Sequence, residues 1–83
     1  MEGDLKFEDM GAAKSGKTRI FEVSNYWDDY LGDVKWYPHW RRYAFFPDSE
    51  CKFDAGCLRR IANFCSKNTE SHWENLRKKK HKK

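Results

Sequence analysis

Three segments in the first half of the chain have the pattern of β-strands. The segment around Val34 and Trp36 alternates apolar with charged positions, which is the period-two pattern of a strand with one buried face. The other two segments are rich in β-branched and aromatic residues, and Pro47 ends the last of them. Short connections favour antiparallel pairing of consecutive strands. We therefore expect a three-stranded meander formed by residues 19–25, 31–37 and 40–46.

The second half of the chain has helical periodicity. Asp54 is a suitable N-cap, because its carboxylate can accept hydrogen bonds from the free N–H groups of a first turn. Phe53 and Leu58 are spaced for a hydrophobic staple across that cap. Further apolar residues follow at helical spacing, namely Ile61, Ala62 and Cys65.

The end of this helix is open to two interpretations. Polar residues 66–69 are expected to end or weaken the helix, and Ser71 with Glu74 has the spacing of a capping box for a second short helix. The alternative is one long helix that reaches about Leu76.

This order of elements predicts an α+β fold, in which a C-terminal α-helix packs on one face of the antiparallel meander. We expect a flexible N-terminal arm at residues 1–18, a single small domain at 19–76 and a basic tail at 77–83. The predicted core consists of Phe21, Val23, Val34, Trp36, Tyr43, Phe45, Leu58, Ile61 and Cys65.

The net charge of +4 over 83 residues comes from the C-terminus. The last seven residues hold six of the 17 Lys and Arg, so the rest carries 11 basic against 13 acidic side chains. The predicted domain is therefore nearly neutral. The tail can neutralise phosphates, but a run of lysines reads no sequence.

The three cysteines are an odd number, and the acidic N-terminus has no apolar run that would act as a secretory signal. Both features favour a reducing, cytoplasmic location. No stretch approaches the ~20 apolar residues of a membrane-spanning helix, so we expect no membrane partner.

The segment from Gly11 to Thr18 matches the phosphate-binding pattern G-x-x-x-x-G-K-T. That loop works between a buried strand and the N-terminus of a helix. Here a strand is expected after Thr18, so we interpret the match as accidental. Weak phosphate affinity of the arm is the alternative.

The Cys and His spacing argues against two other chemistries. Cys51, Cys57, Cys65 and His72 lack the short C-x2-C knuckle of a zinc site. A helix N-terminus could lower the pKa of the Cys57 thiol, with His39 as a base, but no third group is available to orient that base. We expect no enzyme and no cofactor.

Aromatic residues are concentrated between Tyr26 and Phe46. If Val34 and Trp36 face the helix, the opposite sheet face carries aromatics and Arg, a combination that stacks on unpaired bases. The sequence thus favours a small nucleic-acid-binding module. The alternatives are a protein-binding accessory or inhibitor factor that acts by occlusion, or a face hidden by the arm, by the C-terminal segment or in a homodimer. The candidate binding residues are Tyr37, Trp40, Arg42, Phe46, Arg59, Arg60, Lys78, Lys79 and Lys80.

The chain also resembles a group of short uncharacterised phage and bacterial proteins. Residues 31–47 and 53–64 fit their pattern L-G-x-[IV]-x-W-Y-x-x-W-R-x-Y-x-F-x-P…C-L-x-x-I-x-x-F. The resemblance covers about residues 20–65. It implies no specific activity, and it leaves the G-x-x-x-x-G-K-T segment outside the shared region.

Overall fold

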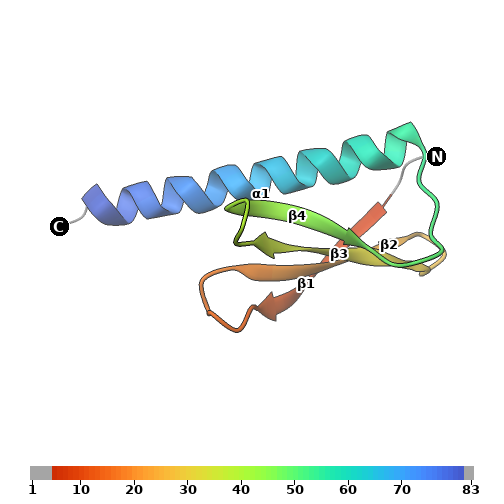
Figure 1. Ribbon diagram of the computed structural model, residues 1–83, viewed down its shortest axis with the longest axis horizontal. Helices are drawn as coiled ribbons and strands as arrows, with labels where there is room; N and C mark the ends of the chain where they lie inside the picture. The colour runs from red at the N-terminus through yellow and green to blue at the C-terminus, as the bar shows by residue number, and fades with distance from the viewer. Residues whose placement is uncertain (1–4, 82–83) are drawn as a thin grey trace.

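The computed structural model describes residues 5–81, with side chains as far as Arg77. Four antiparallel strands form one sheet in the order β1-β2-β3-β4, and a single helix lies across one of its faces (Figure 1). This confirms the α+β class and the C-terminal helix on one face. The elements are β1 (Leu5–Ala12), β2 (Arg19–Asn25), β3 (Tyr30–Tyr37), β4 (Arg42–Pro47) and α1 (Ala55–His81).

The expected number of strands was wrong by one, because much of the expected arm forms β1. Phe7 pairs with Val23 of β2, and its ring stacks on Phe64 of α1 with 4.1 Å between the ring centroids. Burial of Leu5 and Phe7 depends on a helix that lies about 60 positions further along the chain. No local pattern announces such a contact. Residues 1–4 of the expected arm lie outside the described residues.

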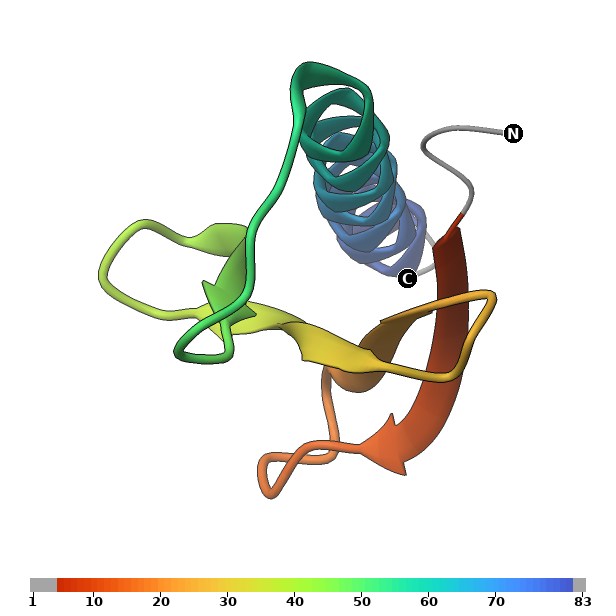
Figure 2. The ribbon, with the colours of Figure 1, turned by 90° about the vertical axis from the view of Figure 1, so that its right-hand side faces the viewer.

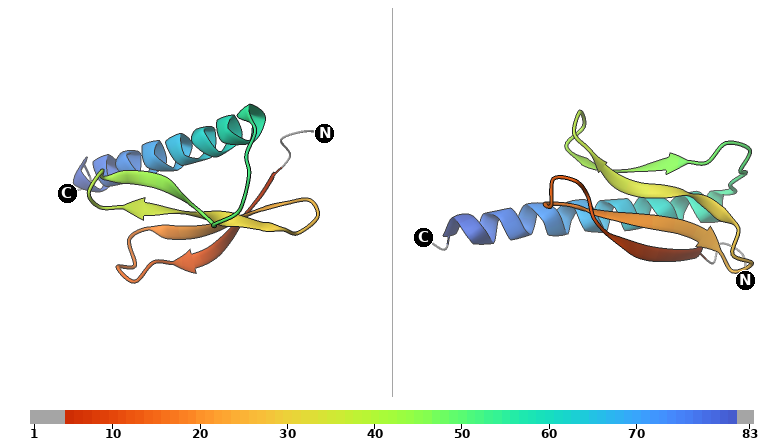
Figure 3. Two further views of the ribbon diagram at one scale, coloured as in Figure 1. Left: turned by 45° about the vertical axis from the view of Figure 1, so that its right-hand side comes forward. Right: turned by 90° about the horizontal axis from the view of Figure 1, so that it is seen from below.

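The break expected at residues 66–69 was also wrong, and the one-helix alternative is confirmed. Asn68 Nδ2 donates to the Phe64 carbonyl at 2.8 Å, and the Thr69 hydroxyl donates to the Cys65 carbonyl at 2.9 Å. These bonds keep both polar side chains inside a regular helix. The helix is about 40 Å long at 1.5 Å per residue, so its C-terminal turns project past the sheet (Figures 1 and 3). The segment expected as a tail from residue 77 thus continues α1 as far as His81.

The core lies between the sheet and α1. Val23 and Val34 are fully buried, and Tyr43 and Ile61 are nearly so. Each buried valine contributes about 1.5–3 kcal/mol relative to an exposed one. The other members of the predicted core that pack against this cluster are half-buried, namely Phe21, Trp36, Phe45 and Cys65.

Leu58 and Leu31 differ from expectation. Leu58 is 51% exposed, although it lies on the same side of the helix as Cys65. Leu31 is buried in the core cluster although it lies out of phase with Val34. The register between β2 and β3 shifts between Val23 and Ser24, and a β-bulge of this kind redirects a side chain.

Both edges of the sheet contact the helix, and the sheet curves around it (Figure 2). On the β4 side, the Trp36 ring packs edge-on to Trp73 with 5.8 Å between the centroids. On the β1 side, the Phe64 ring stacks on Phe7. It also packs edge-on against Phe21, with 4.9 Å between the ring centroids. Aromatic pairs of this geometry contribute about 0.5–1.5 kcal/mol beyond their buried area.

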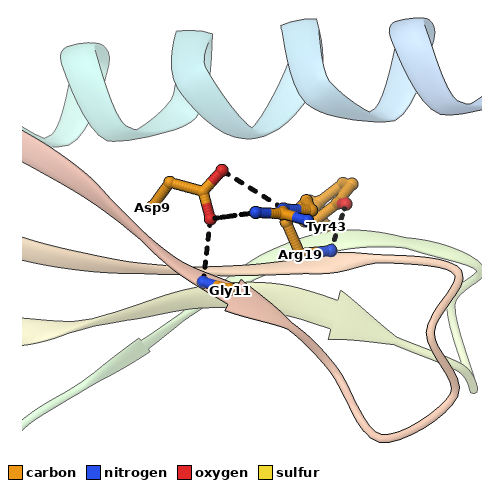
Figure 4. A network of polar contacts seen from close by, with 4 residues as sticks. All are labelled: Asp9, Gly11, Arg19 and Tyr43. Atoms are coloured by element: carbon orange, nitrogen blue, oxygen red, sulfur yellow. Dashed lines mark hydrogen bonds and ion pairs between the residues drawn. The ribbon is translucent and has the colours of Figure 1, made fainter.

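A polar network joins β1, β2 and β4 beneath α1 (Figure 4). The Tyr43 hydroxyl accepts a hydrogen bond from the Arg19 backbone N–H at 3.1 Å. The Arg19 guanidinium donates to the Asp9 carboxylate at 3.1–3.2 Å, and the Gly11 N–H donates to the same carboxylate at 2.9 Å. The Arg19 guanidinium, with the Gly11 N–H, lowers the pKa of Asp9.

Candidate nucleic-acid interface

The sheet face opposite α1 carries the residues that the sequence singled out. Side chains alternate between faces along a strand, and Trp36, Tyr43 and Phe45 lie on the helix side. Tyr37 and Phe46 therefore lie on the other face, which no segment within residues 5–81 covers. The two segments that were expected to hide this face are placed elsewhere: β1 extends the sheet at its edge, and α1 packs on the opposite side.

The rings on this open face form one cluster around Tyr37. Its ring centroid lies 4.7 Å from Trp40, 5.9 Å from Phe46 and 5.3 Å from His39, and each pair is close to perpendicular. The Lys35 ammonium lies 4.7 Å from the centroid of the Phe46 ring. We call Tyr37, His39, Trp40 and Phe46 the aromatic cluster. Trp40 is 62% exposed, so an indole face is available to a planar ligand.

The turn between β3 and β4 fixes Trp40 in place. The N–H groups of Trp40 and Arg41 both donate to the Tyr37 carbonyl, at 3.1 and 2.9 Å. Arg41 closes the turn with a φ of 56°, a left-handed conformation that costs a residue with a Cβ about 1–2 kcal/mol. Its guanidinium lies over the Trp73 ring of α1, 5.6 Å from the centroid, which anchors the turn to the helix and offsets part of that cost.

The other half of the open face is acidic. Glu8 pairs with Glu22, and Glu22 pairs with Asp33, so three carboxylates lie in one row across β1, β2 and β3. The next position in that row is Phe46 of the aromatic cluster. Like charges directly opposite one another destabilise a sheet. We call Glu8, Glu22 and Asp33 the carboxylate row, and it forms a boundary beside the aromatic cluster.

Tyr30 reports the polarity of this acidic half. Burial against its neighbours, together with the hydrogen bond to Asp33 and the charge of Asp33, raises the pKa of the Tyr30 phenol to about 12. Asp48 and Glu22 add to the effect. The local field in this half of the face therefore disfavours a further negative charge, whether a phenolate or a phosphate.

The structure separates the predicted binding residues into groups. It brings Tyr37, Trp40 and Phe46 together, with Arg42 at the start of β4 on the same face. The exposed Arg59 and Arg60 lie near the beginning of α1, in the layer that covers the opposite face. The backbone of residues 78–80 lies in the last turns of α1, and their side chains are outside the description.

The G-x-x-x-x-G-K-T segment forms the hairpin loop between β1 and β2. Ala13 N–H donates to the Thr18 carbonyl and Gly16 N–H to the Ala13 carbonyl, both at 2.8 Å. Strand β2 follows directly at Arg19, which confirms the expected strand after Thr18. The segment thus has the geometry of a hairpin loop and lacks the helix that a phosphate-binding loop of this pattern requires.

The cysteines do not have the environment of reactive thiols. The Cys57 N–H donates to the Asp54 carboxylate at 2.9 Å, which confirms Asp54 as the N-cap. Burial and the hydrogen bond from its thiol to Asp54 raise the pKa of Cys57, opposite to the direction expected from the helix N-terminus. Across the side chains that the structure describes, no group of three or more His, Cys, Asp or Glu is placed to hold a metal ion.

Sequence reasoning missed His39 as a cluster member and missed the carboxylate row. The row depends on register: Glu8, Glu22 and Asp33 are 14 and 11 positions apart, and they align only once the bulge between β2 and β3 is known. His39 was considered only as a base. Its neighbours Pro38 and Trp40 gave a signal for a turn that would place it beside Tyr37.

Comparison with known proteins adds no identification. No protein-family model matches the chain, and neither the curated proteins nor the solved structures contain a match. Within residues 5–81, no helix is long and apolar enough to cross a membrane. The proposed function therefore rests on the fold and on the open face of the sheet. The resemblance to short phage and bacterial proteins stays a prediction.

Proposed function

We propose that the protein binds single-stranded nucleic acid through the aromatic cluster. The observation that carries this proposal is the grouping of Tyr37, Trp40 and Phe46 on an uncovered sheet face, with Lys35 and Arg42 beside them. Aromatic side chains on an open sheet recognise unpaired bases by stacking, because every base has a π-face. Lys35 and Arg42 are placed to contact the phosphates of the same strand.

The geometry favours a small contact area. Trp40 is 62% exposed, whereas Tyr37 and Phe46 are half-buried, and Tyr37 supports Trp40 edge-on at 4.7 Å. Stacking on an aromatic ring contributes about 1–3 kcal/mol per base. The carboxylate row lies directly beside Phe46 and repels phosphate, so the nucleic acid is confined to the β3–β4 half of the face.

A protein partner is the second candidate, and the carboxylate row is the observation that favours it. Three acidic side chains beside aromatic ones suit a partner with basic and apolar groups. Such a partner would use both halves of the open face. The protein would act by occlusion of that partner.

The direct test is binding of a fluorescently labelled single-stranded oligonucleotide, followed by anisotropy over a range of salt concentrations. Trp40→Ala is the informative variant. Trp27→Ala is the matched control, because Trp27 is 82% exposed but lies in the β2–β3 turn, at the opposite end of β3. We expect about a 5-fold to 100-fold loss of affinity with Trp40→Ala, which corresponds to one stacked base. We expect little change with Trp27→Ala.

The salt dependence of affinity and a substitution in the carboxylate row distinguish the two candidate functions. Nucleic-acid affinity should fall steeply with salt, and Glu22→Gln should leave it unchanged or raise it. No binding of the oligonucleotide by the wild-type chain, or equal affinities for Trp40→Ala and wild type, would refute the proposal.

A further inference from the structure

Charge is segregated along the long axis of the molecule. In a meander, the β1–β2 and β3–β4 connections lie at one end of the sheet, and the β2–β3 connection and the segment after β4 lie at the other (Figures 1 and 3). At the first end, the connections carry Lys14, Lys17 and Arg41 and no acidic residue. At the second end, they carry five acidic residues and only Lys52 as a basic one: Asp28, Asp29, Asp48, Glu50 and Asp54.

The helix carries charges of both signs. Arg59 and Arg60 lie in its first turns, at the acidic end, and Glu70 and Glu74 lie near Trp73, toward the basic end. The helix runs antiparallel to β4, so Trp73 lies beside the β3–β4 turn, where it contacts Arg41, and the last turns project past the sheet. Arg77 and the lysines at 78–80 follow in those turns. The domain is nearly neutral as a whole, and the separation of charge is a property of the connections at the two ends of the sheet.

We propose that the β1–β2 hairpin loop, with Lys14 and Lys17, is a second phosphate-contact site for the nucleic acid that stacks on the aromatic cluster. The inference rests on the proposed function and extends it. The strand would run from Trp40, in the β3–β4 turn, across the same end of the sheet, and its phosphates would reach the hairpin loop. The carboxylate row disfavours a path across β2 and β1 on the open face.

The loop is suited to this role by its structure. Lys14 and Lys17 are exposed, and the loop that carries them is closed by the Ala13–Thr18 and Gly16–Ala13 backbone bonds. The Lys17 N–H also donates to the Ser15 hydroxyl at 3.1 Å. A loop ordered in this way loses little backbone conformational entropy when it binds phosphates.

The test measures the salt dependence of affinity for a labelled single-stranded oligonucleotide long enough to span the basic end. The variant is Lys14→Gln with Lys17→Gln, and the control is Lys52→Gln, which removes a loop lysine from the acidic end. Each lost phosphate contact reduces the slope of log affinity against log salt by about 0.7. We therefore expect the slope of the double variant to be lower by about 1.4, and that of Lys52→Gln to be unchanged.

Three outcomes overturn the inference, and they are distinguishable. If the double variant keeps the wild-type slope while Trp40→Ala still weakens binding, the hairpin loop makes no contact and the proposed function stands. If Trp40→Ala and the double variant both bind as the wild type does, both proposals fail. An equal loss of slope with Lys52→Gln would reduce the effect to net charge and would overturn the loop as a site.

Discussion

The side chain of Thr69 joins helix α1 to the backbone of Tyr43 at the edge of the sheet. The Tyr43 N–H donates to the Thr69 hydroxyl oxygen at 2.9 Å, and the hydroxyl donates in turn to the Cys65 carbonyl at 2.9 Å. Strand β4 is an edge strand, so this N–H has no partner strand. One hydroxyl thus provides an acceptor for the N–H of the edge strand and fixes the position of the helix over the sheet.

Thr69→Val should destabilise the fold by about 1–3 kcal/mol, because the isosteric side chain leaves the partly buried Tyr43 N–H without an acceptor. Thr69→Ser keeps the hydroxyl and is the matched control, with a loss of less than about 1 kcal/mol. Urea unfolding followed by tryptophan fluorescence measures both. Equal stability of the valine and serine variants would show that the hydrogen bond contributes nothing.

Gly32→Ala should be among the most destabilising single-methyl changes in the sheet. Gly32 has a φ of +151°, and an added Cβ would lie 2.5 Å from the Phe46 carbonyl oxygen and 2.8 Å from the Pro47 Cα. Both are backbone atoms, so relief requires β3 and β4 to separate. We expect a loss of about 2–4 kcal/mol by thermal or urea unfolding.

Gly56→Ala is the control for that experiment. Its Cβ would meet only the Asp54 carboxylate, at an ordinary 3.5 Å. Alanine is favoured over glycine in a helix by up to about 1 kcal/mol. The two substitutions should therefore have opposite signs, and a tolerated Gly32→Ala would contradict the register assigned to β3 and β4.

Strand β3 and the start of α1 could be predicted from local patterns. The alternation in β3 and the Asp54 cap are each encoded within a few residues. β1 could not be predicted, since the burial of Phe7 comes from Phe64, a distant residue. Within α1, Asn68 and Thr69 bond to carbonyls one turn back, and Thr69 also accepts the Tyr43 N–H, which is a tertiary contact. Local sequence patterns therefore did not predict β1 and predicted a break in α1 that the structure does not have.

The candidate site was predictable only in part. Alternation placed Tyr37 and Phe46 on the face away from the helix, and the structure agrees. The carboxylate row and the charge polarity depend on strand register and chain direction, and neither can be read from composition. Arg59 and Arg60 were grouped with the aromatics by charge alone, and the fold places them in the other layer.

Glu22→Gln should stabilise the protein, because Glu22 lies between Glu8 and Asp33 in the carboxylate row. Removing the central charge relieves two like-charge cross-strand pairs, worth about 0.2–1 kcal/mol each at low salt. The gain should shrink as salt screens the row. Glu74→Gln on the exposed surface of α1 is the control. A destabilised Glu22→Gln variant would show that the row has a cation or partner in solution.

The Asp9–Arg19 pair should appear in the titration of the carboxyl groups by NMR. Arg19 holds the pKa of Asp9 below its ordinary value, so the pair stabilises the fold above the unfolded pKa of about 3.9. That contribution is lost as the pH falls through the lower, folded pKa. In Arg19→Gln, the pKa of Asp9 should rise toward the ordinary value.

Asp54 is the internal control for that titration. The Cys57 N–H lowers the pKa of Asp54 independently of Arg19, so this pKa should stay low in the Arg19→Gln variant. An Asp9 pKa that does not respond to Arg19→Gln would mean that the contact in Figure 4 is not maintained in solution.

The most direct test of the central claim is an NMR titration of the isotope-labelled chain with a single-stranded oligonucleotide. We predict that the largest shift changes fall on Lys35, Tyr37, Trp40 and Phe46, including the indole N–H of Trp40, and that Trp27 stays unchanged. Shift changes confined to the outer surface of α1 around Arg59 and Arg60, or absent at saturating oligonucleotide, would contradict a binding role for the open face.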